Sequence, residues 1–129
     1  MRIAIISIFH QGYGGGCGRV AHDMAEHFAK AQEVLLIHLA GETGLYQRSP
    51  GLRVLGIQSV GEGQASMPNL SRKNVNLMYD TLDAFAPDVV HAHEPASLGL
   101  MAQVWAAMIS AARVKPVRIP TLAGMSGWR

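Results

Sequence analysis

Five glycines fall within seven residues near the amino terminus, in the stretch HQGYGGGCGR that runs from His10 to Arg19. Glycine permits positive φ and lets the backbone approach a ligand closely. A helix that begins here would add N–H groups that carry partial positive charge, and together these features suit an anion such as a pyrophosphate. The predicted phosphate-binding residues are Gly14, Gly15, Gly16, Cys17 and Arg19. A flexible turn that binds nothing is the alternative.

Two familiar phosphate-binding motifs do not fit this stretch. A Walker A loop ends in Gly-Lys-Ser/Thr, and no lysine follows these glycines. The dinucleotide fingerprint counted from Gly12 needs a glycine where Cys17 stands, and counted from Gly14 it needs one where Arg19 stands. His38 also stands near the position where an acidic residue would hold a ribose. These mismatches disfavour, but leave open, a dinucleotide-binding module of an oxidoreductase.

A second group of polar residues forms the segment HAHEP, from His91 to Pro95. His91 and His93 alternate with apolar residues, so they should face the same side of a strand. His93 follows the strand at its carboxyl end, where parallel α/β sheets bind ligands, and is the candidate catalytic residue. His91 is expected to be a core histidine. Glu94 is a candidate acceptor for the hydroxyl groups of a sugar, or else a solvated surface carboxylate.

Two further histidines and the single cysteine could also do chemistry. His10 and His38 fall at or near the carboxyl ends of the first and second predicted strands, and His10 joins the binding candidates. Four histidines at one edge could hold zinc, but a His-x-His pair without a third ligand at fixed spacing does not predict a metal site. Cys17 has no partner for an internal disulfide. Its thiol would be activated at a helix start, or it simply fills a loop.

Alternating strands and helices would position these residues. Continuous apolar runs predict buried parallel strands over residues 3–8, 33–40, 52–57, 88–93 and 117–122, with loops over 41–51 and 61–70. Apolar stripes predict helices from the glycines to Lys30, from an N-cap at Ser71 to before Pro87, and from a cap at Ser97 to about Ala112. The order predicts the α/β class: a Rossmann-like doubly wound parallel sheet of about five strands, with helices on both faces, in a single domain.

Composition narrows the class of protein. The 129 residues are 49% hydrophobic and 16% charged, as in one globular domain. The net charge of +2 and the scattered basic residues do not predict a nucleic-acid partner. The apolar segment from Leu98 to Ala112 is shorter than the roughly 20 residues that span a bilayer, and no signal-peptide cleavage site is present, so a cytoplasmic location is expected. That segment is a core helix or a surface that meets another domain, a subunit or a membrane.

Two segments, in this order, resemble the signatures of family 4 glycosyltransferases of the GT-B fold: MRIAIISIFHQGYGGGCGRVAHDMAEHFAKAQEV and APDVVHAHEPASLGLMA. The resemblance covers about residues 1–122. It implies the N-terminal, acceptor-side domain of a retaining enzyme that transfers a sugar from a nucleotide-diphosphate donor to an acceptor, with no further cofactor. By position, the matching residues are Gly15, Gly16, Arg19, His91, His93, Glu94 and Pro95.

The sequence also departs from the family pattern. Ala31 and Gln32 stand where the family usually has Gly-His, and Ala123 stands where many members have a histidine. The family's donor-binding second domain and its paired glutamates are not found within these 129 residues. We therefore expect no transferase activity from this chain without a C-terminal domain or partner chain, and contact with a membrane surface is a further expectation. A non-catalytic interaction domain that uses the helix over 97–112 is another alternative.

Overall fold

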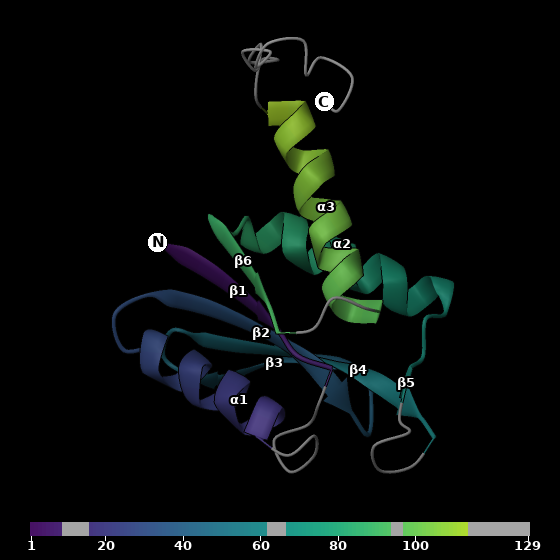
Figure 1. Ribbon diagram of the computed structural model, residues 1–129, viewed down its shortest axis with the longest axis horizontal. Coiled ribbons are helices and arrows are strands. Elements are labelled where there is room, and N and C mark those ends of the chain that lie inside the picture. The colour runs from purple at the N-terminus through teal and green to yellow at the C-terminus, as the bar shows by residue number, and fades with distance from the viewer. Residues whose placement is uncertain (9–15, 62–66, 94–96, 114–129) are drawn as a thin grey trace, which may run out of the picture.

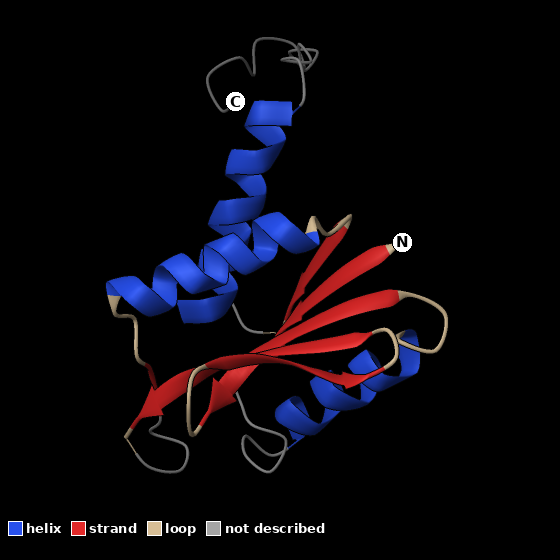
Figure 2. Cartoon of the chain, turned by 180° about the vertical axis from the view of Figure 1, so that it is seen from behind, coloured by secondary structure: helices blue, strands red, loops and turns tan. Residues whose placement is uncertain are grey.

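The computed structural model describes residues 1–8, 16–61, 67–93 and 97–113. The elements in chain order are β1 (Arg2–Ile6), α1 (Gly16–Phe28), β2 (Glu33–Ala40), β3 (Gly44–Ser49), β4 (Leu52–Val60), β5 (Met67–Pro68), α2 (Arg72–Phe85), β6 (Val89–Ala92) and α3 (Ser97–Arg113). Figure 1 shows a twisted sheet with α1 on one face and α2 and α3 on the other. Figure 2 shows the same layers from behind. The predicted α/β class with helices on both faces is confirmed.

The sheet is mostly parallel. Its strand order is β3-β4-β2-β1-β6, and the short β5 pairs with β4. β1 pairs in parallel with both β2 and β6, and β2 pairs in parallel with β4, whereas β3 and β5 are antiparallel to β4. The carboxyl ends of β1, β2, β4 and β6 therefore meet at one edge of the sheet. The predicted strand over residues 117–122 lies outside the described residues.

Two apolar layers cover the two faces of the sheet. On one face, Ala21 and Ala25 of α1 pack against Ile5, Leu36 and Val54, among others. On the other face, residues of α2 and α3 pack against the alternate positions of the same strands: Met78, Leu82, Phe85, Leu98, Ala102 and Trp105 against Ala4, Ile6, Leu35, Ile37, Leu39, Leu55 and Ile57. Successive strand residues point to opposite faces, so β1, β2 and β4 need apolar residues at nearly every position.

The ends of α2 follow the sequence prediction. Ser71 has an extended backbone, and its hydroxyl accepts a hydrogen bond from the Asn74 backbone N–H at 3.3 Å. Such a side chain satisfies one of the N–H groups that a helix start leaves unpaired. At the other end, Ala86 has a left-handed φ of 51° and donates its N–H to the Leu82 carbonyl. Pro87 follows and cannot continue the helix.

The start of α3 differs from the prediction. Ser97 was expected to be an N-cap, but it is the first helical residue and has a φ of 45°. Its Oγ atom is buried and has no hydrogen-bond partner among the described residues. A capping serine has an extended backbone, which aims its oxygen at the first N–H groups of the helix. The left-handed backbone at Ser97 explains why its hydroxyl does not cap.

The two predicted loops each contain a strand. The segment 41–51 holds β3, whose residues are exposed apart from the half-buried Arg48, so it lacks the apolar run that marks a buried strand. It forms because it pairs with β4 through the two-residue turn Pro50-Gly51. Gly51 has a φ of 82°, which fits the third position of a type II turn. The segment 61–70 holds β5, which pairs with Ser59 and Val60.

A hydrogen bond between two side chains links α2 to α3. The indole Nε1–H of Trp105, a residue only 5% exposed, donates to the Asp83 carboxylate at 2.8 Å. We expect Asp83→Ala to lower the free energy of unfolding by about 1–2 kcal/mol, because the buried indole N–H loses its acceptor. Urea denaturation followed by far-ultraviolet circular dichroism measures the change. The matched control is Asp80→Ala, at an exposed aspartate of the same helix; an equal loss in both variants would contradict the prediction.

Candidate functional site

The carboxyl edge of the sheet brings the ends of β1 and β6 together. Beyond the strands the backbone ladder continues by one residue, because the N–H of Ser7 donates to the Ile37 carbonyl and the N–H of His93 donates to the Ile6 carbonyl, both at 2.9 Å. His93 therefore lies beside the end of β1, from which the chain leads to α1. In open α/β sheets this is the edge where ligands bind.

The two histidines of HAHEP lie on the α1 face of the sheet. His91 is in register with Ile5, which packs on that face, and His93 follows two residues later. Their ring centroids are 4.6 Å apart, so the prediction that they face the same side is confirmed. The prediction of a core position for His91 is wrong, because this residue is exposed. β6 is an edge strand of the described sheet, and α1 lies over β1 and β2 rather than over β6.

His93 combines partial burial with an unused polar atom. Its Nε2 atom is buried and has no hydrogen-bond partner among the described residues. Burial, and secondly the neighbouring His91, lower the pKa of His93 below the ordinary value of 6.5. The imidazole is therefore neutral at pH 7, with one nitrogen that donates and one that accepts. Such a ring can give a hydrogen bond to a ligand oxygen or take a proton from a hydroxyl.

A titration tests this account of His93. We expect His91→Asn to raise the pKa of His93, because the variant removes a like charge, and to leave it below 6.5, because burial is the larger cause. Unfolded His93 takes up a proton near pH 6.5, whereas folded His93 takes it up only at a lower pH. His93 therefore lowers the free energy of unfolding as the pH drops below 6.5. NMR titration of the imidazole Cε1 protons gives the pKa. A pKa of His93 at or above 6.5 in the unchanged protein would contradict it.

The structure describes only some of the other predicted site residues. His10, Gly14, Gly15 and Glu94 lie outside the described residues, while Gly16 and Cys17 begin α1. No acidic residue lies in the first turn of α1, so no carboxylate there offsets the positive end of the helix dipole. The Arg19 side chain is 78% exposed and 3.8 Å from Asp23, a surface pair that restrains it little. The roles of all these residues stay predictions.

A second pair of histidines, His22 and His38, is buried between α1 and the same face of the sheet. His38 does lie near the carboxyl end of β2, as predicted, but it is buried, and its ring centroid is 4.8 Å from that of His22 on α1. Sequence reasoning missed His22, although its place between Ala21 and Ala25 puts it on the buried stripe of the helix. Within the described ranges, no group of three His, Cys, Asp or Glu side chains could hold a metal ion.

A comparison with known protein families assigns the chain to a family. The sequence profile described as Glycosyltransferase Family 4 matches residues 14–120, which is more than half of the 129 residues. The chain belongs to Glycosyltransferase Family 4. The matched range includes both the glycines from Gly14 onward and the HAHEP segment, so the resemblance predicted from these residues is confirmed at the level of the family. No curated protein matched the sequence of this family 4 chain.

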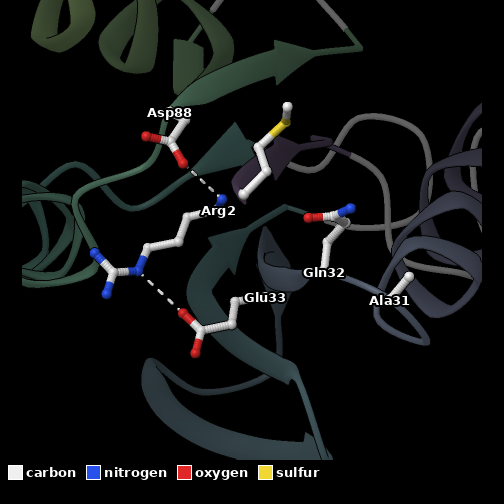
Figure 3. Close-up of a pocket in the computed structure, with 6 residues that line it drawn as sticks. Arg2, Ala31, Gln32, Glu33 and Asp88 are labelled. Carbon is white, nitrogen blue, oxygen red and sulfur yellow. Dashed lines mark hydrogen bonds and ion pairs between the residues drawn. The ribbon is translucent and has the colours of Figure 1, made fainter.

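A hollow in this family 4 domain lies at the opposite, amino-terminal edge of the sheet. It has a volume of about 530 Å³ and is lined by Arg2, Gln32, Glu33 and Asp88, among others (Figure 3). The Arg2 backbone N–H donates to the Asp88 carboxylate at 2.8 Å, and Arg2 Nε pairs with Glu33 at 3.0 Å. Both lining carboxylates thus already pair with Arg2, and the hollow lies away from the carboxyl edge. We interpret it as a junction of strand ends rather than a ligand site.

α3 of the family 4 domain has two different faces. Leu98, Ala102 and Trp105 are buried against the sheet, in agreement with a core helix. The opposite face exposes a stripe at helical spacing, formed by Leu100, Val104 and Met108, which are 52%, 44% and 62% exposed. The core-helix interpretation therefore holds for one face of α3, and the contact surface stays a prediction for the exposed face. In the part of the chain that the structure describes, no helix is long and apolar enough to cross a bilayer.

Proposed function

We propose that this chain is the N-terminal, acceptor-side domain of a retaining glycosyltransferase of the GT-B fold. It would act on a sugar held as a nucleotide diphosphate and on an acceptor that carries a hydroxyl group. The observation that carries the proposal is the family 4 match together with the position of His93, half-buried at the carboxyl edge with an unpaired Nε2 among the described residues.

In this proposal the domain acts mainly through electrostatics. The N–H groups at the start of α1 and the glycine backbone before it bind the departing diphosphate, as helix starts commonly bind anions. His93 is neutral at pH 7, so it contributes a hydrogen bond rather than a positive charge. Arg19 supplies a cation and Glu94 accepts from a sugar hydroxyl. Donors fixed before the reaction stabilise the charge that develops as the diphosphate leaves.

The proposal assigns most of the donor contacts to a second domain. The family resemblance implies a C-terminal, donor-binding domain or a partner chain that faces the carboxyl edge described above. We therefore expect the 129-residue chain alone to turn over no nucleotide sugar. We also infer a cytoplasmic location, with the exposed stripe of α3 at Leu100, Val104 and Met108 available for contact with a membrane or a further domain.

NMR titration of the labelled chain tests the proposal. Inorganic pyrophosphate and UDP should shift the amide signals at the start of α1 and the ring signals of His93, with saturation at millimolar concentration or below. NAD⁺ is the rival ligand, because it fits a dinucleotide module of an oxidoreductase. Tighter binding of NAD⁺ than of UDP at this edge, or no response of α1 and His93 to any of the three, would overturn the proposal.

A further inference from the structure

Arg48, on the edge strand β3, holds two residues of α1 at once. Its Nη1 atom lies 3.0 Å from Nδ1 of His22, and its Nη2 atom lies 3.0 Å from Oε1 of Glu26. His22 and Glu26 are four residues apart, so they stand one above the other on the same side of the helix. The Arg48 side chain is only 28% exposed. One guanidinium thus joins the edge of the sheet to a full turn of α1.

These contacts fix where the protons of two buried histidines lie. A guanidinium has only donors, so Nδ1 of His22 accepts, and the neutral ring carries its proton on Nε2. The Leu39 carbonyl can only accept, so Nδ1 of His38, which contacts it, carries the proton of that ring. The two rings are 2% and 5% exposed. His22 therefore holds Arg48 only while it is uncharged.

We propose that Arg48, His22 and Glu26 form a proton-sensitive clasp that fastens β3 to α1 and loosens when His22 takes up one proton. A protonated His22 offers no acceptor atom to Arg48 and places a second positive charge beside it, on a ring that is only 2% exposed. The clasp does not depend on the proposed function. It ties the helix whose start forms the candidate site to the sheet edge that lies farthest from His93.

The groups that face His22 from the surrounding elements set the direction of the effect. His38 faces it from β2 and Arg48 from β3, and protonating His38 would add a further positive charge. Glu26, on α1 itself, is the one carboxylate in these contacts and offsets part of the repulsion. The same face of the sheet also carries Ser7, which follows β1 and does not titrate, and His91 in β6 with His93 just after it. Once His22 is protonated, two adjacent positive charges, on His22 and Arg48, share the carboxylate of Glu26, so proton uptake weakens the clasp.

Urea unfolding at several pH values tests the clasp. The variant His22→Asn keeps an acceptor oxygen near the position of Nδ1 but cannot be protonated. Between pH 6.5 and pH 5.5, we expect the unfolding constant of the unchanged protein to rise up to about tenfold more than that of His22→Asn, the limit for one proton. His27→Asn is the matched control, because His27 is an exposed histidine of the same helix. It should keep the pH dependence of the unchanged protein.

Nitrogen-15 NMR of the unchanged protein gives an independent readout that does not require a variant to fold. At pH 7.5 we expect His22 in the neutral form with its proton on Nε2, and His38 in the form with its proton on Nδ1. As the pH falls and His22 titrates, the signals of Arg48 and Glu26 should move together with those of His22. A His22 that is charged at pH 7.5 or protonated on Nδ1 would overturn the proposal. So would a pH dependence of unfolding that is the same in His22→Asn and the unchanged protein.

Discussion

Gly51→Ala is expected to lower the free energy of unfolding by about 2–5 kcal/mol. Gly51 has a φ of 82°, and a left-handed backbone costs a residue with a side chain about 1–2 kcal/mol. The added Cβ would also stand 2.7 Å from the backbone carbonyl oxygen of Ala29, in the turn that follows α1. A backbone atom cannot rotate away as a side chain can, and overpacking of this kind costs about 1–3 kcal/mol more.

Chemical denaturation gives the free energy of unfolding of Gly51→Ala and of a control in which another glycine is replaced by alanine. The comparison separates the effect at Gly51 from the general effect of replacing a glycine by alanine. Gly44→Ala is the control, because nothing lies within 4 Å of a Cβ added there. Its free energy of unfolding should stay within about 0.5 kcal/mol of the unchanged protein. Gly51 also accepts a hydrogen bond from the Val34 N–H at 2.7 Å, so a displaced turn would disturb the start of β2 as well. Equal stability of the two variants would show that the turn adapts freely.

His93→Ala is expected to weaken pyrophosphate or UDP binding by about 10- to 100-fold. A hydrogen bond to a charged group contributes about 1.5–3 kcal/mol, and each 1.4 kcal/mol is a factor of ten in Kd. The buried Nε2 has no partner among the described residues, so its removal breaks no side-chain hydrogen bond there and should change stability little. Isothermal titration calorimetry gives the Kd, and urea denaturation checks the fold.

Two further variants make the result on His93 specific. His93→Gln keeps a donor near the position of Nε2 and should recover part of the affinity. His91→Ala removes the exposed neighbouring ring, 4.6 Å away, and should leave Kd within a factor of about three. If His91→Ala weakens binding as much as His93→Ala does, the ligand is held by the pair, or elsewhere, and His93 does not have the role proposed for it.

The strands that could be predicted from the sequence are those with apolar residues on both faces. β2 runs over Glu33–Ala40 as predicted, because helices cover both of its sides and its apolar run is continuous. β3 could not be found in this way, because an exposed edge strand needs no apolar run. The pair Pro50-Gly51 was the available signal, since this dipeptide favours a type II turn and so indicates that the flanking segments pair.

For the candidate site, location was easier to predict than burial. His93 could be placed at the carboxyl edge because strand direction alone decides where a strand ends. The exposure of His91 depends on which strand is outermost and on which strands α1 covers, and both follow from pairings far apart in the sequence. The partnership of His22 with Arg48 depends on the unpredicted strand β3. No local pattern marks such a contact.

The central position of β1 has a consequence for the order of folding. Arg2, the first residue of β1, contacts Glu33 of β2, which lies 31 positions later in the sequence. It also contacts Asp88, just before β6, which lies 86 positions later. In contrast, β3 and β4 are joined by a two-residue turn. Contacts between distant segments form more slowly than local ones, because a longer loop must close first. During synthesis the β3–β4 hairpin can form before β6, which pairs with one edge of β1, has been made. His93 therefore reaches its place beside β1 only after residues 1–93 have left the ribosome, so the candidate site assembles late.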